Sequence, residues 1–176
     1  LVSASVSHIR EHNRLTPDPA NPLNRIQTGE ARIRGAELES RLQPIRQVQL
    51  LLNYTFLDAR ILRSNGPDRG MRLPVVPRHN TSLWATRSFA VRSLDGLLTL
   101  GGGVRYNGAS FDGRDSLRTP SFTLVDLMGS FERNSWRFAV NAANLADKTY
   151  LSACLARGDC FYGMRRTVTA TLGYRF

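Results

Sequence analysis

The sequence lacks any apolar run long enough for a transmembrane helix, which needs about 18 or more consecutive apolar residues. This excludes a helical membrane protein. It does not exclude one built from strands, because only every second residue of such a strand faces lipid and average hydropathy stays low. The mean hydropathy is slightly negative, at -0.28. Residues 1–6 lack a start methionine and the charged and apolar segments of a signal peptide, so we expect the chain to be a fragment of a longer protein.

Lysine is almost absent, since Lys148 is the only one, yet Lys and Arg number 24 against 14 acidic residues and give a net charge of +10. A strongly basic protein can bind nucleic acid. The arginines are scattered along the chain, however, without a basic stripe or a nucleic-acid-binding motif. We therefore favour arginine-lined surfaces that face an anionic lipid leaflet, and we predict no nucleic-acid partner.

Cysteine is also scarce, with Cys154 and Cys160 as the only pair. A disulfide that closes a small loop is favoured over two free thiols and implies an oxidising compartment. A metal site would need more ligands, and the histidines lie far away in the sequence, at His8, His12 and His79. Serine, histidine and aspartate residues form no catalytic constellation and no nucleophile elbow, so we expect neither an enzyme nor a cofactor.

Strict two-residue alternation of apolar and polar side chains is the main pattern present. In the last ten residues one face carries Val168, Ala170, Leu172, Tyr174 and Phe176. A helix, with its period of 3.6 residues, cannot produce this pattern. The alternation predicts eight strands, at residues 2–10, 30–42, 48–56, 80–90, 98–106, 121–131, 136–143 and 167–176.

The connections between these strands are alternately long and short. They are long at 11–29, 59–79, 108–120 and 145–161, and short at 43–47, 91–95 and 132–134. Bacterial outer-membrane barrels are built in this way, with short periplasmic turns and longer extracellular loops. The phase predicts that the last strand runs towards the periplasm, that Phe176 lies at the periplasmic rim, and that the cysteine pair lies outside the cell.

The same alternation assigns the two faces of the predicted sheet. Apolar residues face lipid, with aromatic side chains near the membrane interfaces, namely Tyr54, Phe56, Trp136, Tyr174 and Phe176. Polar residues face the lumen. The run Gly101-Gly102-Gly103 lies inside an alternating strand, so close packing on the lumen side is favoured over phosphate binding. Arg34 and Arg166 fall on the outer face, and we expect them above the bilayer at the level of lipopolysaccharide, or beside a bulge.

Several motifs are similar to those of TonB-dependent siderophore receptors of the ferrichrome-receptor type. Residues 144–150 read Asn-Leu-Ala-Asp-Lys-Thr-Tyr, where the family has Phe at the position of Ala146. The cysteine pair and the Tyr-Gly of residues 162–163 follow, and Tyr174 and Phe176 resemble the C-terminal assembly signature of outer-membrane proteins. Further matches occur in the same order at residues 29–39, 53–59, 73–84, 101–106 and 120–126, so the resemblance spans residues 29–176.

This resemblance implies an all-β fold in which residues 1–176 are the C-terminal part of a 22-stranded transmembrane antiparallel barrel. The family barrel is closed by a plug domain that contacts TonB, and both the plug and the early strands are absent here. The resemblance implies an outer-membrane receptor that imports ferric siderophores, with lipopolysaccharide as a further partner. We expect the carboxylates Glu37, Glu39 and Asp126 to face the lumen and to pair with plug arginines or with Arg105 and Arg137.

Siderophore contacts are expected in the long loops, where aromatic faces and guanidinium groups suit an iron centre in an organic shell. The candidates for ligand or lipopolysaccharide contact, which compete with a role in loop packing alone, are Phe111, Arg114, Arg118, Phe161 and Tyr162. Alternative functions are a passive porin or a small complete eight-stranded barrel. A soluble β-rich binding protein would carry its apolar face inside instead.

Overall fold

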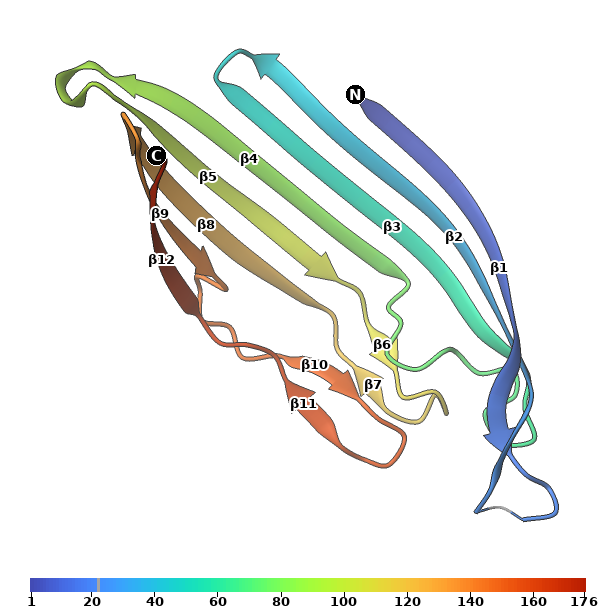
Figure 1. Cartoon of the computed structure of the whole chain (residues 1–176). Helices are drawn as coiled ribbons and strands as arrows, with labels where there is room; N and C mark the ends of the chain where they lie inside the picture. The colour runs from blue at the N-terminus through green and yellow to red at the C-terminus, as the bar shows by residue number, and fades with distance from the viewer. Residues whose placement is uncertain (22) are drawn as a thin grey trace.

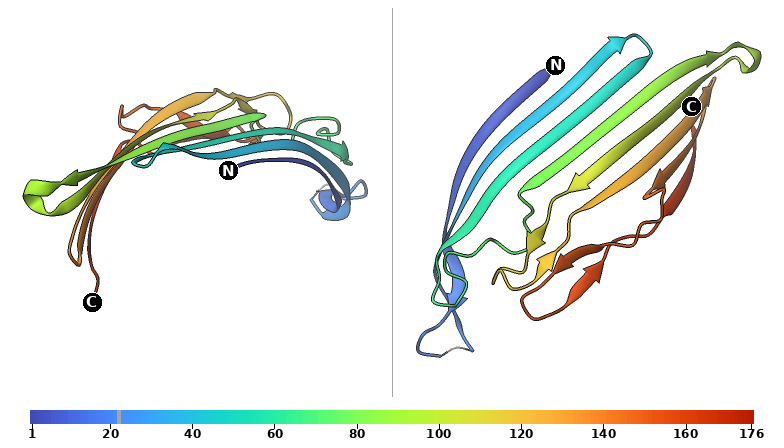
Figure 2. Two further views of the ribbon diagram at one scale, coloured as in Figure 1. Left: turned by 90° about the horizontal axis from the view of Figure 1, so that it is seen from above. Right: turned by 180° about the vertical axis from the view of Figure 1, so that it is seen from behind.

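The computed structural model describes residues 1–21 and 23–176, and it consists mainly of one curved antiparallel sheet (Figures 1 and 2). Its eight strands follow the order β1-β2-β3-β4-β5-β8-β9-β12, with β1 and β12 at the two edges. They are β1 (Val2–Pro17), β2 (Arg25–Ile45), β3 (Val48–Arg63), β4 (His79–Val91), β5 (Gly96–Asn107), β8 (Phe122–Arg133), β9 (Trp136–Ala143) and β12 (Thr167–Tyr174). All eight predicted strands are present.

Short turns join the strands at one end of the sheet and long connections join them at the other (Figure 1). The short-turn end carries both chain termini and the 3-10 turn η1 (Arg92–Leu94). Asp95 and Asn134 adopt positive φ angles of 46° and 49° there, which Asp and Asn tolerate better than most residues. The long connections hold two small hairpins, β6 (Ser110–Phe111) with β7 (Arg118–Thr119), and β10 (Leu151–Cys154) with β11 (Cys160–Tyr162). The described residues include no helix with the length and apolar character needed to cross a membrane.

The predicted connection at residues 11–29 is wrong in extent, because most of it is strand. β1 continues to Pro17 and β2 already begins at Arg25. A bulge explains the error: Asn13 has a φ of 60°, and the pairing register shifts on both sides of Arg14. A one-residue insertion moves every following side chain to the other face, so the two-residue period in the sequence is interrupted at this point. β3 likewise extends into the predicted loop at 59–79, and β12 ends two residues before Phe176.

The predicted apolar residues share one face of the sheet. The cross-strand register places Leu172 opposite Phe138 and Phe138 opposite Phe131, and it pairs Val168 with Ala142. Val168 and Leu172 keep exposed fractions of 62% and 66%, so this face is not a dry protein interior. On β8 the pattern is clearer than the sequence suggested, because Val125 and Leu127 lie on this apolar face while Leu124 and Asp126 lie on the other.

Aromatic side chains mark both ends of the apolar face. At the short-turn end, the rings of Trp136 and Tyr174 lie 4.7 Å apart, and Tyr174 meets Phe176 at 5.1 Å. At the long-loop end, Tyr54 and Phe56 flank His79, and the Tyr54 hydroxyl lies 2.9 Å from His79 Nδ1. Two aromatic bands separated by aliphatic residues match the predicted membrane interfaces.

The opposite face is polar and more crowded. Arg105 donates to the Asp126 carboxylate at 3.0 Å, which is one of the predicted pairings. Arg137 pairs instead with Glu132, at 3.3 Å. Gly103 lies directly beneath the indole of Trp84, and a Cβ there would overlap the ring. The glycine run therefore permits close approach within a strand, as predicted, rather than binding phosphate at the start of a helix.

The polarity of the two faces reverses towards the long-loop end of β2 and β3. From the short turn up to the pair Ala36–Phe56, which is the membrane wall, even-numbered residues of β2 and β3 such as Leu38 and Phe56 are apolar and share the apolar face. Beyond the pair Ala36–Phe56, the even-numbered positions carry Arg34 and Arg32, while the odd-numbered Ala31, Ala59 and Ile61 are buried on the polar side. On this face of β2 and β3, the residues thus change from apolar to charged within one step along the strand, beyond the pair Ala36–Phe56.

Candidate functional site

The long connections gather at one end of the sheet (Figure 1). The segment 64–78 binds the loop end of β3 through four backbone hydrogen bonds, which include those from Ile61 N–H to the Met71 carbonyl at 3.0 Å and from Leu73 N–H to the Ala59 carbonyl at 3.1 Å. The Val75 N–H then donates to Phe111 at 2.8 Å, which ties this segment to the β6–β7 hairpin. Two connections far apart in the sequence are therefore joined by backbone hydrogen bonding.

Asn144 holds the base of the last long connection. The residue is 2% exposed, and its side chain donates to the backbone carbonyls of Lys148 at 2.8 Å and Met164 at 3.1 Å and accepts from Lys148 N–H at 2.9 Å. Its own backbone N–H donates to Asp126 at 2.8 Å. The positive φ of 51° is one that Asn adopts more readily than most residues. The first residue of the family-like motif is therefore a structural anchor.

Asp147 and Tyr150 serve the same loop base. The Asp147 carboxylate accepts hydrogen bonds from Arg165 Nε at 2.9 Å and from the Arg166 backbone N–H at 2.9 Å. The hydrogen bond from Arg165, followed by that from Arg166, holds the pKa of Asp147 far below its usual range. The ring of Tyr150 packs on Phe122 at 4.2 Å and lies against Gly163, where a Cβ would overlap it. Together these contacts fix where the β10–β11 hairpin leaves the sheet.

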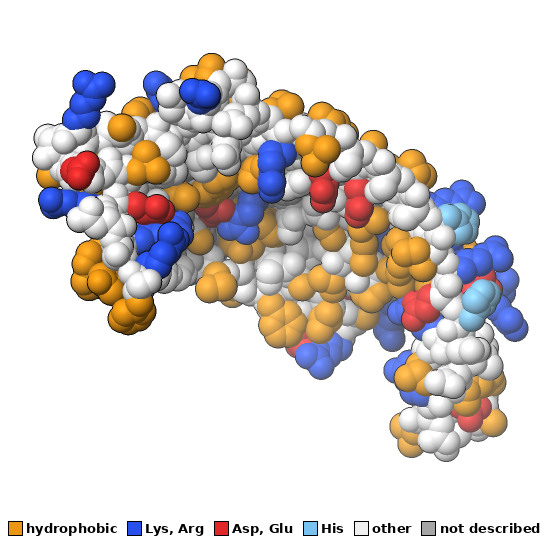
Figure 3. All heavy atoms as spheres, turned by 45° about the horizontal axis from the view of Figure 1, so that its top comes forward, with side chains coloured by type: hydrophobic (Ala, Val, Ile, Leu, Met, Phe, Trp, Pro, Cys, Tyr) orange, Lys and Arg blue, Asp and Glu red, His pale blue; other side chains and the backbone are white. Residues whose placement is uncertain are grey.

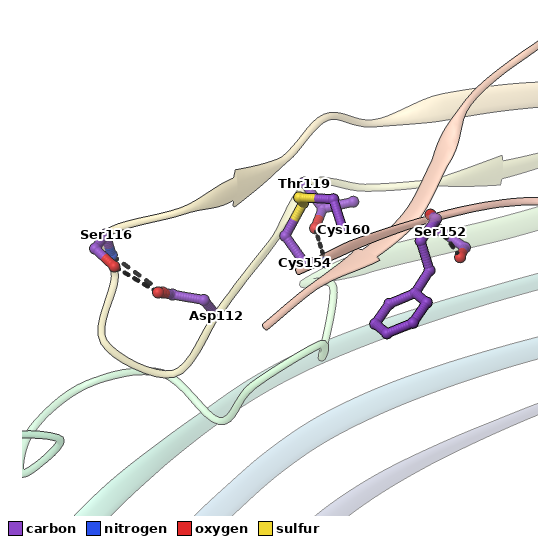
Figure 4. Close-up of a disulfide and its surroundings, with 7 residues drawn as sticks. Asp112, Ser116, Thr119, Ser152, Cys154 and Cys160 are labelled. Atoms are coloured by element: carbon purple, nitrogen blue, oxygen red, sulfur yellow. Dashed lines mark hydrogen bonds between the residues drawn. A yellow bond between two sulfur atoms is a disulfide. The ribbon is translucent and has the colours of Figure 1, made fainter. Parts of the chain in front are cut away.

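The β10–β11 hairpin is closed by the predicted disulfide between Cys154 and Cys160, whose Cα atoms lie 4.1 Å apart (Figure 4). Gly158, with a φ of 102°, makes the turn, and Arg157 pairs with Asp159 within it. The hairpin docks on β7 through a hydrogen bond of 2.9 Å from Cys154 N–H to the Thr119 hydroxyl. Because Thr119 is buried, this contact is shielded from water.

Asp112 shapes the tip of the β6–β7 hairpin. It is buried and accepts hydrogen bonds from the Ser116 hydroxyl and from the backbone N–H groups of Arg114 and Ser116 (Figure 4). Burial acts to raise the pKa of its carboxyl, but these hydrogen bonds together outweigh burial, and the pKa is lowered. Asp112 therefore stays ionised and holds the turn that presents Arg114.

Two hollows lie on the polar side of the sheet near these hairpins. The larger, the polar-face hollow, has a volume of about 460 Å³. Its polar lining includes Asn53, Thr55, Ser82, Arg105, Tyr150 and Ser152. The smaller, the loop hollow, has a volume of about 160 Å³, and its lining includes Arg14, Arg25, Ile61, Asp112, Arg114 and Ala156. Both are open spaces lined by hydrogen-bonding groups, which suits recognition of a polar ligand.

A third hollow, the basic hollow, opens beside Tyr106 and His79, which belong to the apolar face. Its volume is about 320 Å³, and Arg72, Arg78, Phe111 and Arg118 also line it. The Arg72 guanidinium lies 3.9 Å from the centre of the Phe111 ring, a cation–π contact. Phe111 and Arg118 pair across the β6–β7 hairpin, so their side chains share one side of it.

The five predicted contact residues are therefore divided. Phe111 and Arg118 lie in the basic hollow, whereas Arg114 lines the loop hollow. Phe161 and Tyr162 stand on β11 with exposed fractions of 47% and 74%. Sequence reasoning missed Arg14, Arg25 and Arg72, because they fall in segments read as loops and carry no periodic signal. The bulge at Asn13, if recognised, would have placed Arg14 on the polar side.

The sheet is open, curved and antiparallel, and its apolar face lies between two aromatic bands. These are the features of the wall of an outer-membrane β-barrel. The family model described as TonB dependent receptor-like, beta-barrel matches residues 1–145. The chain is 32% identical over 182 residues to the ferrichrome outer membrane transporter/phage receptor of Escherichia coli K12, covering 100% of this chain and 24% of that protein. It is 33% identical over 181 residues to the ferrioxamine B receptor of Salmonella typhimurium SL1344, covering 99% and 25%.

The fold is also shared with the ferric yersiniabactin uptake receptor FyuA of Yersinia pestis. That crystal structure superposes with a TM-score of 0.84 at 20% identity, covering 99% of this chain and 27% of FyuA. The chain belongs to the TonB-dependent receptor β-barrel family and is part of an outer-membrane barrel. It spans about a quarter of the length of the curated relatives it matches. Its apolar face is accordingly the lipid-facing one.

Proposed function

We propose that the protein containing this chain is an outer-membrane receptor that imports ferric siderophores. The observation that carries this proposal is the 32–33% identity to a ferrichrome transporter and a ferrioxamine B receptor along 99–100% of the chain, its long connections included. Polar hollows on the lumen side, beneath the hairpins, support it. Energy would come from TonB acting on a plug domain outside this chain, and the ferric ion would be cargo rather than a cofactor.

Among the predicted contact residues, we assign Arg114, Phe161 and Tyr162 to the siderophore. Arg114 lines the loop hollow on the lumen side, and a guanidinium there suits anionic oxygen donors. Phe161 and Tyr162 present exposed rings on the disulfide-closed hairpin, and such rings offer contact area at small entropic cost. Phe111, which faces the basic hollow on the other side, serves as the matched comparison.

Uptake by the complete receptor tests the proposal directly. The receptor is expressed in an Escherichia coli strain that lacks its own siderophore receptors, and growth under iron limitation is measured with ferrichrome, ferrioxamine B and a ferric catecholate. We expect at least one of them to support growth, and only when TonB is present. Growth that persists without TonB would indicate a passive pore. Failure to bind every ferric siderophore offered would overturn the proposal.

The site assignment is tested separately by binding. The double variant Phe161→Ala/Tyr162→Ala and the single variant Arg114→Ala are expected to weaken binding of the transported siderophore by about tenfold or more, since each removes a contact of about 1–2 kcal/mol. Phe111→Ala is the control and should bind like the parent receptor. Equal affinity in all three variants would remove these residues from the site while leaving uptake itself intact.

The runner-up function, a small complete eight-stranded barrel, has less support. The strand order of the main sheet is linear, and β1 and β12 lie at opposite edges. Closure of a barrel needs these two edges to pair. The sheet is instead open and curved, as expected of one section of a larger wall (Figure 2).

A further inference from the structure

Three arginines from three separate segments line the loop hollow. Arg14 comes from β1, Arg25 from the start of β2, and Arg114 from the tip of the β6–β7 hairpin. None of the ion pairs in the described part of the chain includes any of the three. Figure 3 shows basic side chains gathered where β1 and β2 form one end of the sheet, and such a surface attracts anions through its long-range field.

The bulge in β1 turns Arg14 into this hollow. Unbroken alternation would place Arg14 on the same side as Arg10 and His12, which is the lipid-facing side. The register instead shifts on both sides of Arg14 and pairs it with Gly29, so that Arg14 lines the loop hollow together with Ile61. A Cβ at Gly29 would lie only 2.8 Å from the Arg14 carbonyl oxygen, so the glycine permits this close approach. Bulges often re-aim a side chain beside a functional site.

One guanidinium nitrogen of Arg14 lacks an acceptor. Its Nη1 atom is buried and makes no hydrogen bond with the residues that the structure describes. Burial of a charged donor without an acceptor costs free energy, and the large majority of buried polar atoms in proteins do have a partner. An anionic oxygen bound in the loop hollow would supply the missing acceptor.

The acidic residues of the loop hollow are engaged within their own loops. Asp68 accepts a hydrogen bond from the Ser64 hydroxyl, and Asp112 accepts from the Ser116 hydroxyl and from backbone N–H groups of its turn. These carboxylates hold the loops in shape and form no ion pair with the arginines of the hollow. The lining keeps three arginines against two aspartates, so its net charge is positive.

The segments that carry the arginines are held together before any ligand arrives. The Asn65 side-chain amide donates to the hydroxyls of Thr16 and Thr28, at 3.1 Å and 3.0 Å, and so joins the segment 64–78 to β1 and β2. The same segment donates a backbone hydrogen bond to Phe111 of the β6–β7 hairpin. A site that is fixed in advance loses less conformational freedom on binding, which raises its affinity.

The size of the loop hollow limits what can enter it. Its volume of about 160 Å³ holds about five water-sized groups, since one water takes about 30 Å³ of the liquid. The iron centre of a ferric siderophore, with its shell of donor atoms and their backbone, is larger than this. A carboxylate at the end of a short chain fits. The group that enters is therefore a peripheral anion that does not coordinate the iron.

We propose that the loop hollow binds a free carboxylate of the siderophore, so that the receptor selects carboxylate-bearing ferric siderophores over neutral ones. Guanidinium groups bind carboxylates in a bidentate geometry, and Arg14, Arg25 and Arg114 present three of them around one small space. This inference rests on the proposed import function and names the substrate class that it serves.

A matched pair of ligands tests the proposal on the complete receptor. The free amine of ferrioxamine B is acylated with either an acetyl or a succinyl group. The iron centre is the same in both products, and only the succinyl form ends in a carboxylate. The affinity of the purified receptor for each form is measured by isothermal titration calorimetry.

Three variants are compared with the parent receptor. Arg14→Gln/Arg25→Gln/Arg114→Gln removes the positive charge of the loop hollow, and the Lys version of the same triple keeps the charge without the planar fork. The control, Arg46→Gln/Arg92→Gln/Arg133→Gln, removes three exposed arginines from the short turns. Thermal unfolding of each purified variant reports whether it is folded.

We expect the parent receptor to bind the succinyl form about tenfold or more tightly than the acetyl form, as a hydrogen-bonded charge pair implies. The Gln triple should bind the two forms equally, the Lys triple should keep part of the preference, and the control should match the parent.

Three results would overturn the proposal: no preference in the parent receptor, an undiminished preference in the Gln triple, or binding of neither form by a receptor that takes up another ferric siderophore. The import function itself fails only if every ferric siderophore in the uptake experiment fails. The two outcomes are therefore distinguishable.

Discussion

The membrane wall and the loop end of this sheet share one hydrogen-bonded ladder but oppose each other in polarity. In the wall, apolar side chains such as Leu83 and Val104 point to one face and polar ones to the other. Beyond the aromatic band of Tyr54 and Phe56, arginines occupy the lipid-facing positions, and Ala31 and Ile61 are buried on the opposite, polar side. Backbone pairing sets the alternation, and the medium on each side decides which residues fill it. The reversal marks where lipid gives way to water.

The largest effect on stability is expected when an arginine, the residue type of the loop end, replaces an apolar residue on the lipid-facing side of the wall. Leu83 lies on the lipid-facing side between Leu52 and Val104. Leu83→Arg is expected to lower the free energy of unfolding of the receptor by about 2–4 kcal/mol, the cost of arginine near the bilayer midplane. Denaturation of the receptor in lipid vesicles measures it. Gln49→Arg on the polar face is the control, and a similar loss in both variants would contradict the assignment of the faces.

A smaller effect is expected when the loop end loses its buried polar anchor. Asn144→Ala removes three side-chain hydrogen bonds and leaves the carbonyls of Lys148 and Met164 without a donor. The expected loss of stability is about 1–3 kcal/mol. It should appear as faster hydrogen exchange in residues 145–166, while exchange in β4 and β5 stays slow. Asn141→Ala, on an exposed position of β9, should leave both segments unchanged. Equal exchange in the two variants would show that Asn144 is not an anchor.

The smallest effect concerns the exposed pair at the same loop base. Because hydrogen bonds from Arg165 and Arg166 lower the pKa of Asp147, its contribution is complete above the ordinary aspartate pKa of about 3.9 and is lost as the pH falls below that value. Protection of the Arg166 amide against hydrogen exchange should therefore be constant from neutral pH to about pH 4 and decline below it. Asp147→Asn should remove this step. A decline that begins near pH 6 would assign it to another group.

The wall could be predicted from the sequence because its two faces meet different media. Residues 167–174 alternate without a break, and the structure places them in one strand with the predicted face assignment. The signal weakens where both sides of a strand meet water. At Asn13 and Arg14 a bulge also moves the side chains from one face to the other, so residues 11–17 of β1 and 25–29 of β2 fall within the predicted loop.

The candidate site was predictable in its location but not in its internal arrangement. The alternation of connection lengths predicts that the long connections and the cysteine pair share one end of the sheet, and the structure places them there; that this end binds the siderophore stays a prediction. Sequence alone could not separate Phe111 and Arg118 from Arg114, because the hairpin that carries them has only two residues in each strand. Which side of the sheet each residue meets depends on hydrogen bonds between distant segments, such as Val75 to Phe111.

Unequal strand lengths set how much change each part of the wall accepts. β9 and β12 have eight residues each, close to the roughly 9–11 that a tilted strand needs to cross a bilayer, whereas β2 has 21. Deleting two residues from β9 or β12 would draw loop backbone into the hydrocarbon, where its polar groups find no partners. The distal half of the β1–β2 hairpin has length to spare. It is therefore the place where a peptide tag or epitope is accommodated without shortening the membrane span.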